Sequence, residues 1–212
     1  MDDKISQIRK SYLSGELNEA GVGGDPIAMF GNWMKAAIEA GIDEPNGMAL
    51  ATASPDGEPS VRIVLLRGFD ERGFVFYTNY ESAKGQELAV NPRAALTLWW
   101  QPLERQVRIN GRVEKLARQE SQAYFETRPR GHRLSAWASP QSHVVTGRAE
   151  LEQRAQEVET LFPGDVPLPD FWGGYRLTPE RMEFWQGREN RLHDRFLFER
   201  RQGVWTAARL AP

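Results

Sequence analysis

The sequence contains no cysteine in its 212 residues. Disulfide bonds, zinc–thiolate centres, iron–sulfur clusters and cysteine nucleophiles are therefore excluded. The first ten residues also lack the apolar core of a secretory signal, and apolar runs such as 63–66 are too short to span a bilayer. A chain of this kind is typical of the cytoplasm, so we expect that location and no membrane partner.

Histidine is scarce, with His132, His143 and His193 as its three occurrences. No local histidine-based metal motif can be assembled from them, and we expect no bound metal. A hydrolytic triad is disfavoured because it needs a base beside its nucleophile, and no Gly-x-Ser-x-Gly elbow occurs. Neither a dinucleotide fingerprint nor a phosphate-binding P-loop is present. Adjacent carboxylates such as Asp43 and Glu44 lie in polar stretches, where we expect them to be solvated.

The chain also lacks a strong charge of either sign. Its formal net charge is −2 and no block of like charge stands out. This argues against a nucleic-acid partner held by bulk electrostatics, but not against a local anion pocket. The length, together with the absence of repeats and of a clear linker, predicts a single domain over residues 1–212.

The hydrophobic pattern predicts helices first and then mostly strands. Asp25 and Pro26 are typical of an N-cap and a first helical residue, and the apolar stripe that follows ends near Gly41. Further helices are predicted at 3–14, from the Ser82 cap to Val90, and at 119–127, 134–138 and 150–161. Strands are predicted at 48–53, 61–66 (buried), 74–78, 94–100, 105–116, 171–177, 181–185, 195–200 and 204–209, with a hairpin loop at 69–73. This order is not a βαβ alternation and predicts a mainly β, α+β fold, with an antiparallel barrel-like sheet and peripheral helices.

The segment 184–196 carries the densest chemistry. In an extended strand, Arg191, His193 and Arg195 would leave the same face, whereas a helix would scatter them. The flanking aromatic residues favour the strand. Such a face suits a flat, anionic, heteroaromatic ligand, and a solvated strand face with incidental arginines is the alternative that stays open.

Other cations stand near strand ends and at a helix start. Arg62 and Arg67 are about 16 Å apart if they share one extended strand, so they would serve two anions or the two ends of one ligand. Lys84 lies in the first turn after Ser82, where a phosphate would also meet free backbone N–H groups. Tyr124 and Arg128 share a helix face, as residues i and i+4. Each alone is more typical of a surface ion pair, but together they predict two phosphorylated aromatic ligands.

Several short motifs occur in an order and spacing that resemble the pyridoxamine (pyridoxine) 5′-phosphate oxidase family. They are Arg62-Ile-Val-Leu-Leu, Phe76-Tyr-Thr-Asn, Glu104-Arg-Gln-Val, Tyr124-Phe with Arg128-Pro-Arg, Gln141-Ser, Phe171-Trp-Gly-Gly-Tyr, Phe184-Trp-Gln-Gly and Arg191-Leu-His-Asp-Arg. The resemblance implies an antiparallel FMN-binding split β-barrel, and a homodimer with FMN at the subunit interface. It also implies that the helical segment 1–40 serves as a lid and a packing extension.

The same resemblance implies the site residues. The FMN contacts match Arg62, Ile63, Val64, Leu65, Leu66, Arg67, Tyr77, Thr78, Ser82, Lys84, Gln106, Gln141, Ser142, Trp185 and Arg195. The substrate contacts match Arg9, Tyr12, Arg67, Tyr124, Arg128, His132, Arg191 and His193, and the last two are the implied catalytic residues.

Three positions depart from the family pattern. Arg67 replaces the usual lysine, which exchanges a point charge for a planar fork. Ala83 replaces a frequent arginine, so one charge-assisted phosphate contact, typically about 1.5–3 kcal/mol, would be missing. His132 replaces a common serine and would make phosphate binding pH-dependent.

The implied reaction is oxidation of pyridoxamine or pyridoxine 5′-phosphate at C4′ to pyridoxal 5′-phosphate. Oxygen is the terminal acceptor, hydrogen peroxide is released, and the amine substrate also yields ammonia. One alternative keeps the flavin but takes another reduced aromatic substrate, such as a phenazine precursor. Another is a flavin- or vitamin B6-binding protein without turnover.

Overall fold

The computed structural model describes residues 4–212. Residue 3 of the predicted first helix, and residues 1–3 of the predicted 1–40 segment, lie outside the described residues. The chain forms two compact units. Unit 1 consists of the chain up to Met48, Leu96–Asn110 and Pro179–Pro212, and unit 2 of Ala49–Ala95 and Gly111–Thr178.

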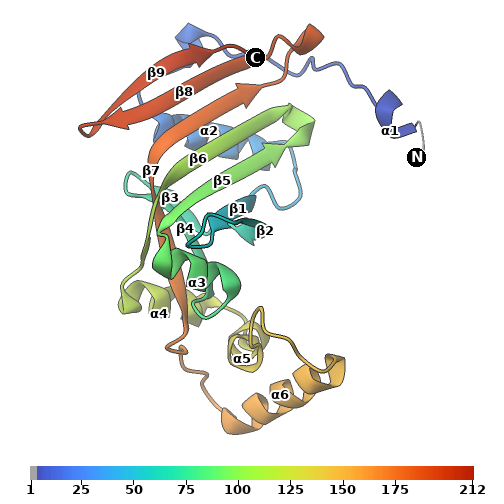
Figure 1. Ribbon diagram of the computed structural model, residues 1–212, viewed down its shortest axis with the longest axis vertical. Coiled ribbons are helices and arrows are strands. Elements are labelled where there is room, and N and C mark those ends of the chain that lie inside the picture. Colours follow the sequence, from blue (N-terminus) through green and yellow to red (C-terminus); the bar gives the residue numbers. More distant parts are fainter. Residues whose placement is uncertain (1–3) are drawn as a thin grey trace. The chain divides into compact units, whose positions relative to one another are not determined.

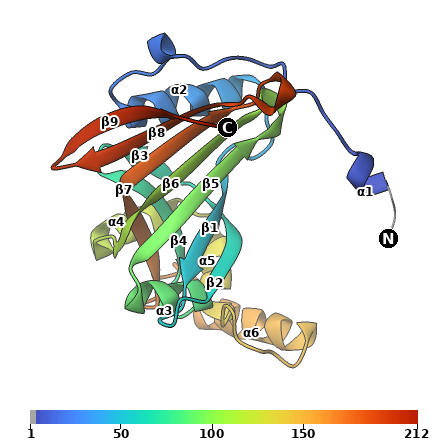
Figure 2. The same ribbon diagram turned by 45° about the horizontal axis from the view of Figure 1, so that its top comes forward.

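Unit 1 is built on helix α2 (Pro26–Glu39) and the C-terminal strands. The Asp25 carboxylate caps α2 by accepting hydrogen bonds from the N–H groups of Ile27 (2.8 Å) and Ala28 (3.2 Å), as the sequence predicts. Helix α2 lies against the sheet that contains strands β5 (Arg93–Trp100) and β7 (Trp172–Gln186) (Figures 1 and 2). From its buried stripe, the Phe30 ring lies 6.1 Å from Trp100 of β5, and the Trp33 ring meets Phe184 of β7 edge-on at 5.2 Å. The unit also contains α1 (Lys4–Gln7) and the short turns η1 (Glu19–Gly21), η2 (Gln101–Leu103) and η3 (Glu189–Arg191).

Unit 2 combines short strands with four helices. Its strands include β1 (Gly47–Ala53), β2 (Pro59–Leu65), β3 (Gly68–Asp70) and β4 (Gly73–Asn79). Its helices are α3 (Ala83–Val90), α4 (Arg118–Thr127), α5 (Arg130–Ala138) and α6 (Arg148–Leu161). Phe125 of α4 and Ala136 of α5 form a core cluster with Val166, Leu168 and Trp172.

The strands follow the order β2-β1-β5-β6-β7-β4-β3, with β6 at Arg105–Lys115. Strand β8 (Asp194–Arg201) pairs with β7, and β9 (Val204–Leu210) pairs with β8. The β3–β4, β4–β7, β7–β8 and β8–β9 pairs are all antiparallel. The predicted antiparallel sheet with peripheral helices is thus confirmed. Within residues 4–212, no helix is both long and apolar enough to cross a membrane.

The predicted break between strands at 171–177 and 181–185 is wrong, because β7 runs through it. Residues 172–177 of β7 pair with β4 and residues 181–186 pair with β8. Pro179 lies between the residues of β7 that pair with β4 and those that pair with β8, so its missing N–H interrupts neither of these two ladders. The predicted hairpin loop at 69–73 is also shorter than expected, because 68–70 form β3 and pair with 73–75.

The strand prediction for Arg191, His193 and Arg195 is wrong as well. The β7–β8 hairpin closes with Gln186 opposite Asp194, so the residues between them form its loop. Asn190 (φ 54°) and Arg191 (φ 63°) adopt left-handed backbone conformations, which end any strand alternation. Arg195 alone of the three lies in a strand.

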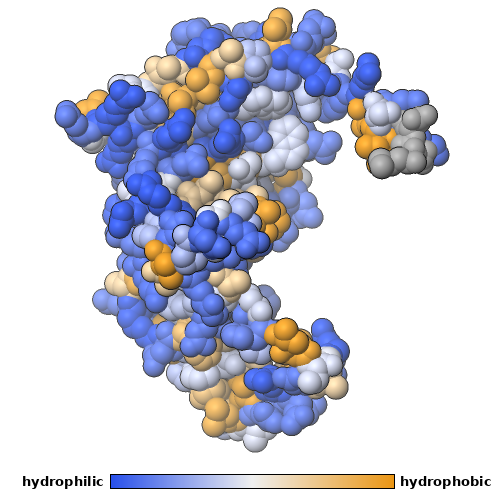
Figure 3. Space-filling model, in the orientation of Figure 1, coloured by the Kyte–Doolittle hydropathy of each residue, from blue (hydrophilic) through white to orange (hydrophobic). Residues whose placement is uncertain are grey.

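Two further predictions fail for lack of burial. The helix expected at 3–14 shrinks to Lys4–Gln7, and its apolar side chains stay exposed, as Figure 3 shows on α1. A short helix needs a packed apolar face, which Ile5 and Ile8 do not have. The strand at 61–66 is predicted to be buried, yet Val61 and Ile63 are exposed, because residues 4–212 leave the face of β2 that carries them largely uncovered.

Candidate active site

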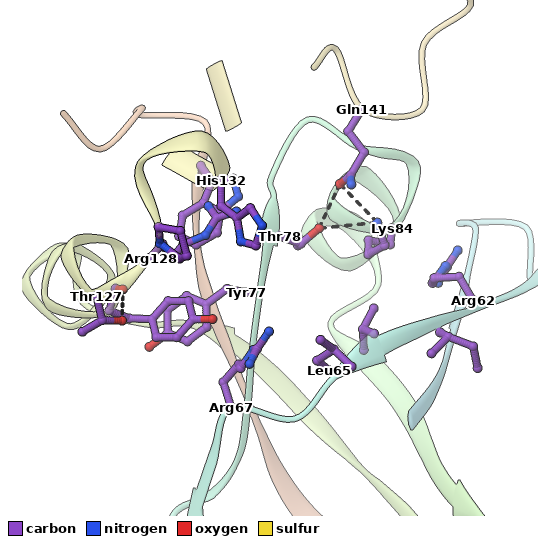
Figure 4. Close-up of a pocket in the computed structure, with 15 residues that line it drawn as sticks. Arg62, Leu65, Arg67, Tyr77, Thr78, Lys84, Thr127, Arg128, His132 and Gln141 are labelled. Carbon is purple, nitrogen blue, oxygen red and sulfur yellow. Dashed lines mark hydrogen bonds between the residues drawn. The ribbon is translucent and has the colours of Figure 1, made fainter. Parts of the chain in front are cut away.

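One cavity of about 540 Å³ lies wholly within unit 2. Strands β2 and β4 and helices α3, α4 and α5 all contribute side chains to its wall (Figure 4). The lining residues are Arg62, Ile63, Val64, Leu65, Arg67, Tyr77, Thr78, Lys84, Tyr124, Thr127, Arg128, Pro129, His132, Gln141 and Trp172. The structure therefore brings together most of the residues matched to the FMN and substrate phosphate contacts.

Lys84 marks one side of this cavity. Ser82 caps α3 as predicted, and Lys84 follows in the first turn with only 8% of its surface exposed. Its ammonium lies 3.3–3.5 Å from the side-chain oxygens of Gln141, Thr78 and Ser82. All three partners are neutral, and burial, with repulsion from Arg62, lowers the pKa of Lys84. A cation in these surroundings gains by binding an anion.

Arg62 lines the same side of the cavity but already has a carboxylate partner. Its guanidinium lies 3.2 Å from Glu87 of α3 and also donates to the hydroxyls of Thr52 and Ser60. Glu87 was not foreseen, because nothing in the sequence joins two residues 25 positions apart. The ion pair orients the Arg62 side chain, and the Glu87 carboxylate partly offsets the positive charge that Arg62 presents to the cavity.

Arg128 marks the other side of the cavity. Its guanidinium lies 4.5 Å from the centre of the Trp172 ring, and Trp172 belongs to an aromatic stack with Tyr77 and Tyr124. The Nη1 atom of Arg128 is buried and has no hydrogen-bond partner among residues 4–212. A buried donor without a partner is costly, and an anionic ligand would supply the missing acceptor. Trp172 falls in a motif of the sequence, but its stacking with Arg128 has no sequence signal.

Arg67, between β2 and β3, and His132, in α5, lie on the same side of the cavity as Arg128. Both are exposed and both line the cavity. Figure 4 shows Lys84 and Arg62 on one side, and Arg67, Arg128 and His132 on the other. One cavity thus presents two separate groups of cations.

A second cavity, of about 490 Å³, lies wholly within unit 1. It is lined by Ile8, Arg9, Lys10, Ser11, Tyr12, Trp185, Arg188, Asn190, Arg191 and His193. Here the rings of Tyr12, Trp185 and His193 meet, with centroids 4.6–5.7 Å apart. The predicted residues Arg9, Tyr12, Trp185, Arg191 and His193 are therefore gathered in this unit.

The His193 ring is oriented by the backbone of its own loop. The Arg188 N–H donates to Nδ1 of His193 at 3.1 Å, which leaves the hydrogen of a neutral ring on Nε2. Burial, together with the charges of Arg191 and Arg195, lowers the pKa of His193. The neutral imidazole is thereby favoured, with an Nε2–H donor.

Five predicted site residues line neither of these two cavities. Leu66 and Ser82 are buried, Ser142 is exposed, and Gln106 lines a smaller cavity with Trp99 and Trp185. Arg195 is ion-paired with Glu183 at 2.8 Å and donates to the Ala211 carbonyl. Among residues 4–212, no group of three or more metal-ligating side chains is found.

Two family models match the chain. The model described as pyridoxamine 5′-phosphate oxidase matches residues 34–162, and the pyridoxine 5′-phosphate oxidase C-terminal dimerisation region matches residues 172–212. Curated relatives named pyridoxine/pyridoxamine 5′-phosphate oxidase match nearly full length. That of Rubrobacter xylanophilus is 56% identical and covers 98% of this chain and 96% of the relative. That of Cupriavidus pinatubonensis is 54% identical and covers 99% of each.

Solved structures agree on the fold. The crystal structure of PhzG from Burkholderia lata, in complex with tetrahydrophenazine-1-carboxylic acid, has a TM-score of 0.86 and 34% identity, and the match covers 90% of this chain and 94% of that one. A pyridoxamine 5′-phosphate oxidase-related, FMN-binding protein from Nostoc punctiforme has a TM-score of 0.72 at 20% identity, covers 90% of this chain and all of that one, and supports the fold alone. The chain therefore belongs to the pyridoxine/pyridoxamine 5′-phosphate oxidase family, an FMN-dependent family with a split-barrel fold, which confirms the resemblance drawn from its sequence.

Proposed function

We propose that the protein is an FMN-dependent oxidase that converts pyridoxamine or pyridoxine 5′-phosphate to pyridoxal 5′-phosphate. The observation that carries this proposal is the pair of cation groups in one cavity, Lys84 with Arg62 and Arg128 with Arg67. Two phosphorylated ligands, a cofactor and a substrate, need two such groups. The full-length relatives named for this activity support the same assignment.

The residues around Lys84 fit the phosphate of FMN. A buried ammonium beside neutral oxygens at the start of a helix is well suited to a phosphate dianion. Lys84, Thr78, Gln141 and Arg62 would hold this group, while Ala83 withholds the extra arginine contact. FMN, when bound, supplies the electron acceptor for the oxidation and passes the electrons to O₂.

The residues around Arg128 fit the phosphate of the substrate. The unpartnered Nη1 of Arg128 needs an acceptor, and Arg67, Tyr124 and His132 line the same wall. Of the cluster in unit 1, we assign Arg191 to covering the substrate ring and stabilising charge near C4′. His193, neutral and with a free Nε2–H, would donate to a ring substituent.

The dimerisation region at residues 172–212 supports a homodimer, and we further propose that FMN lies at the subunit interface. The cytoplasmic location and the single domain over 1–212 stay predictions.

The proposal is tested by supplying FMN-loaded protein with a panel of substrates and measuring hydrogen peroxide and pyridoxal 5′-phosphate. We expect turnover of both phosphorylated substrates and little turnover of the unphosphorylated vitamers. Arg191→Ala should lower turnover by about 100-fold, the size of effect seen when one charge-stabilising group is removed. Unchanged turnover in Arg191→Ala would rule out its assigned role, and no peroxide from either substrate would leave only a binding function.

A second candidate substrate class rests on one comparison. The Burkholderia lata structure was solved with a reduced phenazine carboxylic acid, which has no phosphate. Arg128 and Arg67 line the same cavity, and two guanidinium groups favour a doubly charged phosphate over a singly charged carboxylate. Faster peroxide release from a reduced phenazine than from pyridoxamine 5′-phosphate would reverse this preference.

A further inference from the structure

Residues 8–14 hold a defined position in unit 1 without regular secondary structure. Ile8 and Leu13 are 79% and 70% exposed, so burial of their apolar side chains does not fix this segment. Three of its polar groups instead converge on one carboxylate. The Glu104 side chain accepts hydrogen bonds from the N–H groups of Leu13 (2.7 Å) and Ser14 (2.9 Å), and its other oxygen pairs with Lys10 at 2.9 Å.

Glu104 is itself held rigidly. It follows the η2 turn in a left-handed conformation (φ 54°) and is only 2% exposed. Its carbonyl accepts from the Gly187 N–H at 2.8 Å and from the Gln186 amide at 3.3 Å. Gln186 is fully buried and is oriented in turn by Arg105 at 2.9 Å. The backbone from which the carboxylate extends is therefore fixed by contacts outside the segment 8–14.

Tyr12 is the residue that these contacts flank. Its ring lies edge-on to Trp185 and to His193, each with centroids 5.7 Å apart. The approach depends on Gly187, because a Cβ atom there would lie 2.8 Å from Tyr12 and 3.1 Å from Glu104. The absence of a side chain at Gly187 thus leaves room for both the Tyr12 and the Glu104 side chains.

We propose that Glu104 is a positioning residue that fastens residues 10–14, so that Tyr12 closes the cavity of Arg191 and His193. The consequence for substrate rests on the proposed function, whereas the fastening itself does not. The charge is essential to this role, because three donors meet one side chain and a neutral amide accepts fewer hydrogen bonds and pairs with no ammonium.

The direct test is limited trypsin digestion of the FMN-loaded protein, followed by mass spectrometry. Trypsin cuts after Lys4, Arg9 and Lys10. The bonds after Arg9 and Lys10 lie at the start of the fastened residues 10–14, whereas the bond after Lys4 lies well before them. We expect Glu104→Gln to speed cleavage after Arg9 and Lys10 by about tenfold or more, the fold-change that follows from losing one charge-assisted hydrogen bond. Cleavage after Lys4 serves as an internal reference, and Glu114→Gln is the matched control, since Glu114 is exposed on β6.

Two further variants separate fastening from general destabilisation. Lys10→Met keeps both backbone hydrogen bonds and should speed cleavage after Arg9 by less than Glu104→Gln does. Gly187→Ala should speed cleavage as Glu104→Gln does, because it displaces Tyr12 and Glu104 together. Circular dichroism and thermal unfolding identify any variant that has lost its fold. Cleavage at the wild-type rate in folded Glu104→Gln would overturn the proposal.

Steady-state kinetics then test whether the fastening of residues 10–14 affects substrate binding. In Glu104→Gln we expect KM for pyridoxamine 5′-phosphate to rise by about tenfold while kcat stays within about twofold, as for the loss of uniform binding. A fall in kcat of about tenfold with an unchanged KM would contradict a role through Tyr12. If the wild-type protein shows no oxidase activity, the proposed function fails, and the proteolysis result still decides the fastening.

Discussion

At the scale of single residues, the site depends on cations that burial has made ready for anions. Lys84 is surrounded by neutral oxygens, and Arg128 has a buried nitrogen without a partner. Both arrangements cost free energy in the free protein and are relieved by a bound phosphate. Arg62 differs, because Glu87 already balances its charge.

Lys84→Met should weaken FMN binding by about 10–100-fold, which corresponds to the loss of a charge-assisted hydrogen bond of about 1.5–3 kcal/mol. Fluorescence titration of the apoprotein with FMN measures this change. Lys35→Met, at an exposed lysine of α2 paired only weakly with Glu39, is the control. Equal affinity in Lys84→Met and wild type would remove Lys84 from the cofactor site.

The lowered pKa of Lys84 also predicts a pH dependence of FMN binding. Only the charged ammonium attracts phosphate, and its pKa in the free protein lies below the ordinary 10.5. Phosphate binding raises this pKa, so FMN affinity is full below the free-protein value and falls as the pH rises through it. Lys84→Arg should flatten the alkaline fall, and a fall of equal steepness in that variant would assign it to another group.

At the scale of elements, α3 carries Lys84 on a tight connection to β4. A Cβ atom on Gly85 would lie 2.1 Å from the Tyr80 carbonyl oxygen, so this helix approaches the preceding backbone more closely than any side chain allows. Gly85→Ala should therefore shift the start of α3 and destabilise the protein by about 1–3 kcal/mol. It should also weaken FMN retention.

Gly131→Ala is the matched control, because Gly131 lies within helix α5 and a Cβ there meets nothing within 4 Å. It should stabilise the protein by roughly 0.5–1 kcal/mol. Urea unfolding of both variants measures the two effects. A Gly85→Ala protein as stable as wild type would show that α3 has room to move.

Elements whose signals are local were predictable from the sequence. The caps at Asp25 and Ser82 and the apolar stripe of α2 were predicted correctly, because a helix start depends on a few neighbouring residues. Tyr124 and Arg128 were predicted to share a helix face, which is wrong, because α4 ends at Thr127 and Arg128 is its C-cap residue with an extended backbone. Both side chains nevertheless line the cavity. The β7 strand was predicted as two, since its continuity depends on which strand pairs with each half.

Features set by distant partners were not predictable. The exposure of Val61 depends on which parts of the chain cover its face of β2, and the loop shape around Arg191 follows from the closure of the β7–β8 hairpin. Glu104 was noted in a motif without a role, because its partners lie about 90 positions earlier in the chain. That these cations bind anions was predicted from the residues themselves, whereas the full set of FMN and substrate contacts was taken from the family resemblance.

At the scale of the whole molecule, the proposed homodimer has a direct genetic test. At an FMN concentration too low to load the Lys84→Met protein, Lys84→Met and Arg191→Ala should each have little activity alone. If every site takes these two residues from different subunits, a hybrid dimer holds one intact site, and co-expressed variants should recover about a quarter of wild-type activity. With a different affinity tag on each variant, the hybrid dimer can be purified and its activity compared with that of the wild-type dimer. No recovery in a purified hybrid would contradict a site shared between subunits.

The central claim is that the protein binds a flavin and oxidises a phosphorylated B6 vitamer with it. The most direct measurement is the visible spectrum of the FMN-loaded protein during anaerobic addition of pyridoxamine 5′-phosphate. We predict about one flavin per chain and loss of its visible bands as substrate is added, with recovery when air is admitted. A flavin that stays oxidised with both pyridoxamine and pyridoxine 5′-phosphate, or a protein that binds no flavin, would contradict the claim.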